Sequence, residues 1–82
     1  LASTRIKPWP WAGAVVVGER HVESGREAFH LFDHWCYLGT VEQREALAGI
    51  GRERRFDPDM WRLFSRWLAV PGRAEGLEPL VP

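Results

Sequence analysis

The apolar positions along the chain change their period near its middle. Residues 13–19 form a short β-branched run bounded by glycines, which predicts a buried strand. Side chains of residues 27–33 alternate between two faces, as in a second strand, and a turn within residues 22–26 joins the two. Residues 35–38 follow a tight turn near Asp33-His34. The first half of the chain therefore predicts an antiparallel meander of three strands.

The second half of the chain has helical spacing. Thr40 and Gln43 match a capping box, in which each side chain bonds the backbone N–H of the other residue. This predicts a first helix that ends at Gly49 or Gly51.

A second helix has a clearer start. Asp57 suits the N-cap, Pro58 suits the first helical position, and Phe56 with Trp61 forms a hydrophobic staple. Pro71 and the following glycine stop it. Its apolar side chains fall within an arc of roughly 160°: Met60, Trp61, Leu63, Phe64, Trp67 and Leu68.

These elements predict a single α+β domain, with a small antiparallel sheet of three or four strands and two helices packed on one face. Residues 1–12 are an extended lead-in stiffened by Pro8 and Pro10, residues 13–70 are the core, and residues 71–82 are a tail that supplies a candidate edge strand. The expected core residues are Val15, Val17, Phe29, Leu31, Trp35, Leu38, Leu47, Ile50, Trp61, Phe64 and Leu68.

Composition narrows the class of protein. The 82 residues include 11 basic and 11 acidic side chains, and this neutrality argues against a freestanding nucleic-acid binder. The lone Cys36 excludes an internal disulfide framework and fits a reducing compartment. No apolar run approaches the length of about 18 residues that a membrane helix needs. The chain begins with Leu1, so we expect it to be a piece of a longer protein.

Three histidines and the cysteine are candidate zinc ligands: His21, His30, His34 and Cys36. The last three would share one face only if a single strand ran unbroken through residues 30–36, and the predicted turn at Asp33-His34 destroys that register. Cys36 could also be a nucleophile beside a histidine base, but no third group is placed to orient the base. Histidines at the rim of the sheet and a small buried thiol are the favoured interpretation.

Five arginines are candidate ligands for a phosphate backbone, because one guanidinium group can donate hydrogen bonds to two phosphate oxygens. They are Arg52, Arg54, Arg55, Arg62 and Arg66. Neighbouring Glu53 and Asp59 support the alternative of a solvated, partly paired surface, which we favour.

The tryptophans are either core residues or platforms for stacking on bases. Trp61 and Trp67 lie on the apolar stripe of the second helix, and Trp35 is also assigned to the core. Trp9 and Trp11, held by the prolines, are the candidate surface residues, and we expect at least one of them to pack as a lid over the sheet edge.

Three segments in order resemble one family: WPWAGAVVVGERH (residues 9–21), FHLFDHWCYLGTV (residues 29–41) and RFDPDMWRLFSRWL (residues 55–68). They are similar to the C-terminal domain of the Cho-type excinucleases, bacterial homologues of the UvrC repair endonuclease. The same domain type closes longer proteins in which an exonuclease domain is fused to such a nuclease. The resemblance covers residues 7–70.

The resemblance implies a non-catalytic accessory domain in bacterial, cytoplasmic nucleotide excision repair. An upstream GIY-YIG nuclease domain with a divalent metal ion would cut the DNA after UvrB is loaded. Tyr37-Leu38-Gly39 only superficially matches the YIG motif, so no catalytic, cofactor or metal residue is assigned here. The domain would hold the nuclease domain or dock UvrB, or alternatively contact DNA through Trp9, Trp11 and the five arginines.

Overall fold

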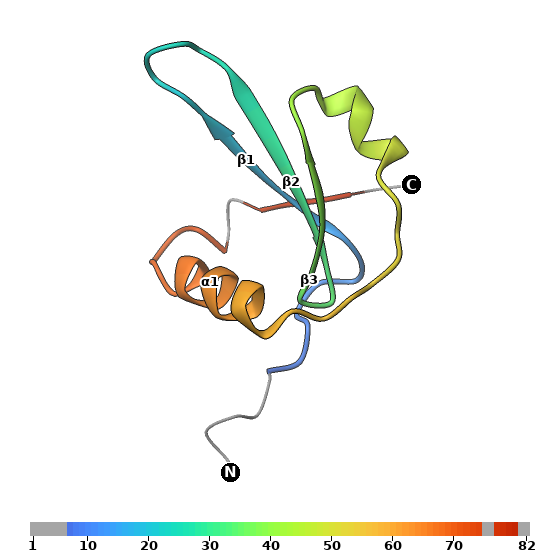
Figure 1. The fold of residues 1–82 in the computed structure, drawn as a ribbon. Helices are drawn as coiled ribbons and strands as arrows, with labels where there is room; N and C mark the ends of the chain where they lie inside the picture. Colours follow the sequence, from blue (N-terminus) through green and yellow to red (C-terminus); the bar gives the residue numbers. More distant parts are fainter. Residues whose placement is uncertain (1–6, 75–76, 81–82) are drawn as a thin grey trace.

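Four antiparallel strands form one sheet in the order β3-β2-β1-β4 (Figure 1). The computed structural model describes residues 7–74 and 77–80. The strands are β1 (Val15–Arg20), β2 (Glu27–Asp33), β3 (Cys36–Val41) and β4 (Glu78–Pro79). The first three make the predicted meander, and the tail adds the fourth strand at the edge, where the Leu80 N–H donates to the Ala14 carbonyl at 2.9 Å.

The hairpin of β1 and β2 fixes which side chains share a face. Val15 lies opposite Phe32 and Val16 lies opposite Leu31, so consecutive pairs point to opposite faces of the sheet. The predicted turn within residues 22–26 closes this hairpin, and the His21 N–H donates to the Arg26 carbonyl at 2.9 Å. The hairpin extends as an arm beyond the rest of the sheet (Figure 1).

The turn between β2 and β3 consists of His34 and Trp35, which have φ values of 47° and 67°. Two positive φ values in a two-residue loop match the twist of the flanking strands, but such turns usually contain Asn and Gly. A bulky residue with positive φ is uncommon and costs conformational energy. Tertiary contacts must therefore hold Trp35 in place.

The lead-in supplies those contacts. The Trp35 indole N–H donates to the Lys7 carbonyl at 2.7 Å, and the Trp9 indole N–H donates to the Gly13 carbonyl at 2.8 Å. Trp9 meets Trp35 edge to face with ring centroids 5.1 Å apart, and it stacks on His34 at 5.8 Å. Residues 7–10 form no helix or strand and residues 11–13 form bends, so the extended lead-in stays a prediction, and residues 1–6 lie outside the described residues.

The second predicted helix is α1 (Pro58–Leu68). Its N-cap Asp57 accepts the Asp59 N–H at 2.9 Å, and Phe56 lies beside Trp61 with ring centroids 6.5 Å apart. Both features confirm the predicted helix start.

The first predicted helix is a 3₁₀ helix, η2 (Arg44–Gly49), and the predicted capping box is wrong. Gln43 is its N-cap but makes no side-chain capping bond. Thr40 instead lies in β3, which runs to Val41 rather than ending at residue 38. Two β-branched residues favour the strand, and the Thr40 hydroxyl bonds His30 across it at 2.8 Å.

The two faces of the sheet carry separate apolar clusters. Leu47 of η2 packs in one cluster with Leu31, and Phe64 of α1 packs in the other with Val15 and Phe32. The prediction of two helices on one face is therefore not confirmed, since each helix covers its own face. Residues 50–57 carry the chain from one face to the other (Figure 1).

Five of the expected core residues are buried: Val15, Phe29, Leu31, Leu47 and Phe64. The others are partly buried. The prediction missed five buried apolar residues: Ala14, Val16, Phe32, Cys36 and Leu77. Because helices cover both faces, consecutive residues of β1 and β2 are buried together, and an alternating pattern identifies only half of them.

We expect Trp9→Ala to destabilise the fold by roughly 2–4 kcal/mol, because it removes the aromatic contacts that hold the His34-Trp35 turn. Urea unfolding followed by circular dichroism measures this change. Val22→Ala is the control, because Val22 is 96% exposed at the hairpin tip and its loss should cost less than about 0.5 kcal/mol. Equal stability of the Trp9 variant and the wild type would contradict the role of the lead-in.

Candidate functional site

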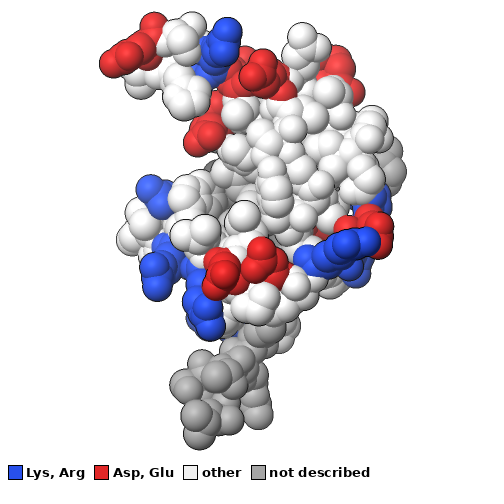
Figure 2. Space-filling view, in the orientation of Figure 1, with Lys and Arg blue, Asp and Glu red and all other residues white. Residues whose placement is uncertain are grey.

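A groove of about 510 Å³ lies between α1 and the sheet. Figure 2 shows the molecule hollowed between the hairpin arm and α1, with uncharged residues across the hollow. The sheet contributes Val17, Glu19, His30, Phe32, Tyr37 and Thr40, and α1 contributes Met60, Leu63, Phe64 and Trp67.

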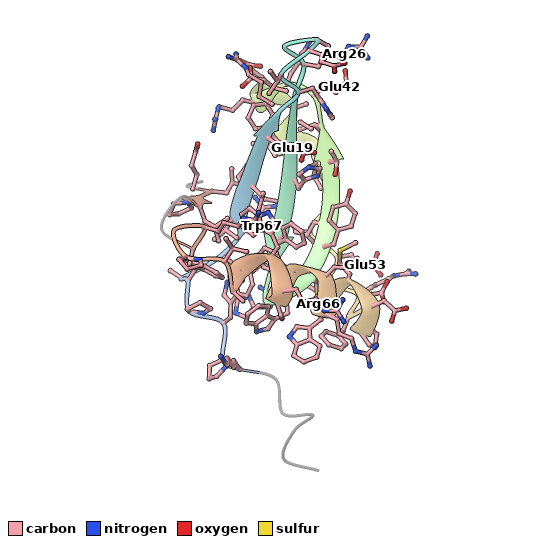
Figure 3. The ribbon with its side chains drawn as sticks, turned by 90° about the vertical axis from the view of Figure 1, so that its left-hand side faces the viewer. Glu19, Arg26, Glu42, Glu53, Arg66 and Trp67 are labelled. Atoms are coloured by element: carbon pink, nitrogen blue, oxygen red, sulfur yellow. The ribbon has the colours of Figure 1, made fainter. Side chains whose placement is uncertain are left out.

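The α1 wall of the groove is apolar. Its four side chains recur at the spacing of one helical face, and the ring of Phe64 stacks on that of Phe32 with centroids 4.1 Å apart. Leu63 remains 60% exposed, and Tyr37 across the groove remains 39% exposed. Figure 3 shows Trp67 on α1 below Glu19 on β1, with Arg66 on the outer side of the helix. The groove is thus an exposed apolar surface with a charged residue at one side.

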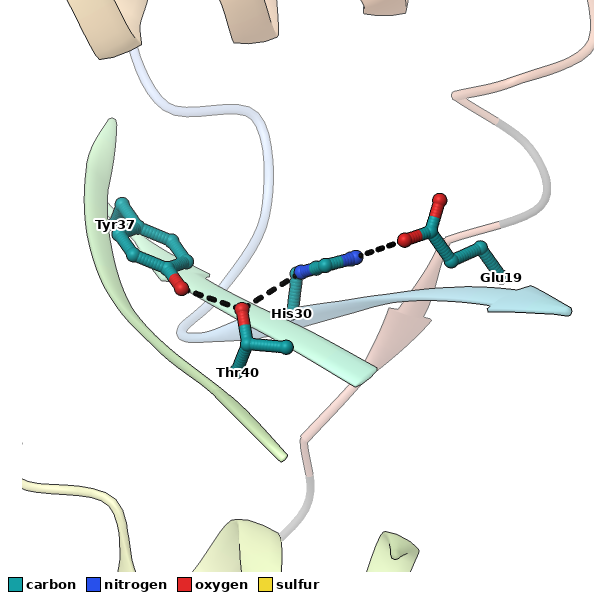
Figure 4. Close-up of polar contacts among 4 residues, drawn as sticks. All are labelled: Glu19, His30, Tyr37 and Thr40. Carbon is teal, nitrogen blue, oxygen red and sulfur yellow. Dashed lines mark hydrogen bonds and ion pairs between the residues drawn. The ribbon is translucent and has the colours of Figure 1, made fainter. Parts of the chain in front are cut away.

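Four side chains form a hydrogen-bonded chain along the floor (Figure 4). His30 Nε2 lies 2.8 Å from Glu19 Oε1, and His30 Nδ1 lies 2.8 Å from Thr40 Oγ1, which also bonds the Tyr37 hydroxyl. A carboxylate only accepts, so in neutral His30 the Nε2–H donates to Glu19, and Nδ1 accepts from the Thr40 hydroxyl. Sequence reasoning missed this chain, which a meander register with His30 opposite Thr40 could have indicated.

A second hollow of about 420 Å³ lies along the other flank of α1. Trp11, Trp35 and Trp61 line it together with Lys7. Helix α1 therefore separates two surfaces, and the second one adjoins the point at which the described chain begins.

The five candidate arginines are dispersed and mostly paired. Arg54 lies 3.1 Å from Asp33 Oδ2, Arg55 lies 3.2 Å from Glu53, and Arg62 lies 3.1 Å from Asp59. Within residues 7–74 and 77–80, Arg52 and Arg66 make no ion pair. Their role in binding a phosphate backbone stays a prediction.

Asp33 is a buried carboxylate that sequence reasoning did not select. Its Oδ1 lies 2.6 Å from His34 Nδ1, and its Oδ2 accepts from Arg54. A buried carboxylate requires such partners, since an unpaired one is costly. Asp33 therefore ties the turn to the segment that leads into α1.

The zinc candidates are not brought together. The His34-Trp35 turn interrupts the strand register, both ring nitrogens of His30 are engaged on the floor of the groove, and His34 bonds Asp33. In the part of the chain that the structure describes, no three His, Cys, Asp or Glu residues are grouped to hold a metal ion.

Cys36 is buried, and burial raises the pKa of its thiol. Nearby Arg54 lowers this pKa and Asp33 raises it, both to a lesser extent than burial. A thiol with a raised pKa is a poor nucleophile at neutral pH, which supports the favoured interpretation of a structural residue.

Trp9 and Trp11 are both half-buried in the apolar cluster under α1, with ring centroids 4.7 Å apart. The expectation that at least one of them packs against the domain is confirmed, whereas its role as a lid over the sheet edge stays a prediction. No helix among the described residues is long and apolar enough to cross a membrane.

The chain is similar to proteins of a known family. A family model described as the excinuclease Cho C-terminal domain matches residues 14–81. The chain belongs to this family. The resemblance found in the sequence is therefore confirmed.

Curated relatives of the domain are much longer than this chain. Excinuclease cho of Escherichia coli K12 is 33% identical over 67 residues, which cover 80% of this chain and 22% of that protein. Excinuclease cho of Salmonella typhi is 29% identical over 79 residues, which cover 95% of this chain and 26% of that protein. The chain thus spans about a quarter or less of the relatives it matches. No solved structure matches it.

We expect native Cys36 to react with iodoacetamide at least about tenfold more slowly than the unfolded chain at pH 8, because burial raises its pKa and blocks access. Mass spectrometry of timed samples measures the reaction. Since the folded state has the higher pKa, stability should fall as the pH rises above the ordinary thiol value of 9.0, and less so in Cys36→Ala. Equal labelling rates in the native and unfolded chain would contradict this assignment.

Proposed function

We propose that the chain is a non-catalytic accessory domain of a bacterial, cytoplasmic DNA-repair nuclease and acts by docking proteins. Its partners would be an upstream GIY-YIG nuclease domain in the same chain, which would bring the divalent metal ion, and UvrB. Family membership and the length of the relatives support a place within a larger excinuclease.

The observation that carries this proposal is the exposed apolar groove beside α1. Grooves that combine exposed apolar side chains with a few polar groups are typical of interaction sites. Among the described residues, the groove lining contains one carboxylate, that of Glu19, and no Lys or Arg. This lining suits an apolar partner surface and is unfavourable for a phosphate backbone.

The two flanks of α1 suit two different partners. The tryptophan-lined hollow adjoins Lys7, where chain from further upstream enters, so we assign it to the nuclease domain of the same chain. The groove on the opposite flank is assigned to UvrB. In this arrangement the domain connects the nuclease to the protein that presents the DNA.

We expect the tagged 82-residue chain to retain purified UvrB of the same bacterium at micromolar concentrations. Isothermal titration measures the affinity, and a chain unfolded by Trp9→Ala with Phe64→Ala serves as the control for nonspecific retention. No binding at 50 µM, roughly the range of weak transient contacts, would count against docking of UvrB.

The alternative function is direct contact with DNA, which the exposed side chains of Arg52 and Arg66 favour, since neither forms an ion pair with a described residue. If it is correct, Arg62→Glu with Arg66→Glu should weaken binding of a 30-mer duplex and reduce the slope of log K against log salt by up to about 2. Fluorescence anisotropy at several salt concentrations measures both.

Arg20→Glu with Arg26→Glu on the hairpin is the matched control, because it makes the same change of charge away from α1. Equal losses in both variants would indicate a general effect of charge. Unchanged affinity in the α1 variant would exclude these arginines as a DNA site.

A further inference from the structure

Helix α1 covers only part of the length of its sheet face. A strand of seven residues such as β2 is about 23 Å long, whereas a packed helix is about 10 Å across. Helix α1 lies at the end of the strands where Val15 pairs with Phe32 (Figure 1, Figure 3). The strands continue past the Glu19–Ala28 pair. The sheet side of the groove, with Val17, Glu19, His30 and Thr40, therefore remains as an open strip about one helix wide beside α1.

One wall of the strip is the apolar face of α1, and its floor consists mainly of polar side chains of the sheet. Val17, His30 and Thr40 lie beyond Phe32 on this face, and Leu63 belongs to the helix wall. On the opposite face η2 packs against the sheet, and the Arg44 guanidinium lies 4.8 Å from the Phe29 ring centroid. The uncovered strip is therefore confined to the face that carries α1.

Glu19 supplies the charge that selects a partner. Its carboxylate is anchored through Oε1 to His30, which Thr40 and Tyr37 hold in turn, and the side chain remains 55% exposed. Oε2 makes no hydrogen bond to the residues that the structure describes, and it points away from the floor in Figure 4. A positioned carboxylate with a free oxygen is complementary to an Arg or Lys.

We propose that this strip is the binding site of an amphipathic helix from a separate protein. The helix lies beside α1, its apolar stripe contacts Leu63, Met60 and Trp67, and an Arg or Lys at the edge of that stripe pairs with Glu19. A sheet face accommodates a helix, whereas an added strand would require a sheet edge. The proposal rests on the proposed docking function and specifies the chemistry of its partner.

The position of the strip favours a separate protein over the rest of the same chain. Lys7 and the lead-in lie on the other flank of α1, where they line the tryptophan-rich hollow. Helix α1 lies between this hollow and the strip. Leu63 therefore lies on the flank assigned to the separate protein, and Trp61 lies on the flank assigned to the nuclease domain.

The first test places the photoreactive residue p-benzoylphenylalanine at position 63 of the complete protein, with UvrB as the probe. We expect a cross-link to a UvrB helix that carries an apolar residue with an Arg or Lys one turn away. The same photoreactive residue at position 70 is the control, because Val70 is exposed just after the end of α1 but lines neither hollow.

The outcomes separate this inference from the proposed function. A cross-link from position 63 to the protein's own nuclease domain, or to a non-helical segment of UvrB, overturns the inference alone. The same holds when UvrB binds but no cross-link forms. Absence of any UvrB binding overturns both.

The second test reverses the charge of Glu19. We expect Glu19→Lys to weaken UvrB binding at least tenfold and Glu19→Gln to weaken it about threefold, because the first adds repulsion while the second removes attraction. Glu23→Lys at the hairpin tip is the control for net charge and should bind as the wild type does. Replacing the cross-linked basic residue of UvrB with Glu should restore binding to Glu19→Lys.

No difference between the Lys variants at positions 19 and 23 would overturn the role of Glu19. Circular dichroism of each variant checks that the fold is retained, since Glu19 is exposed and its partner His30 keeps Thr40 as a second contact.

Discussion

The tight turn between β2 and β3 is the constraint on which the rest of the structure depends. It places Trp35 at a positive φ that bulky residues avoid, and it buries the carboxylate of Asp33 at the adjoining end of β2. Neither feature is stable without tertiary partners. Trp9 and Lys7 hold Trp35, whereas His34 and Arg54 hold Asp33, so the turn connects the lead-in to the segment before α1.

This connection also sets the position of α1. Phe64 stacks on Phe32, meets Trp35 edge to face at 5.9 Å, and lies 6.2 Å from Trp9. The helix is therefore fixed at the turn end of the sheet and leaves the hairpin end open. The two hollows lie on the two flanks of the helix fixed in this way.

Sequence patterns predicted the turns and helix starts that depend on residues close together in the chain. The Ser24-Gly25 turn, the N-cap Asp57 and the staple of Phe56 and Trp61 depend on neighbours in the chain, and all are confirmed. The capping box at Thr40 was wrong because a cross-strand bond to His30 replaced it, and that partner lies ten residues away. The placement of η2, the pairing of the buried Asp33 with the exposed Arg54 and the chain from Glu19 to Tyr37 depend on register and on long-range packing. Single-sequence patterns do not encode these features.

The open strip is notable because a domain of this size has little apolar surface to spare. A chain of about 80 residues buries only about 60–65% of its unfolded surface, so exposed apolar side chains reduce a small margin of stability. Here Leu63 is exposed on the helix wall while the floor beneath carries an ordered polar chain. Glu19, His30 and Thr40 are not members of the apolar cluster under α1. A carboxylate that His30 holds in place is consistent with recognition, because it is complementary to a basic group that approaches from outside.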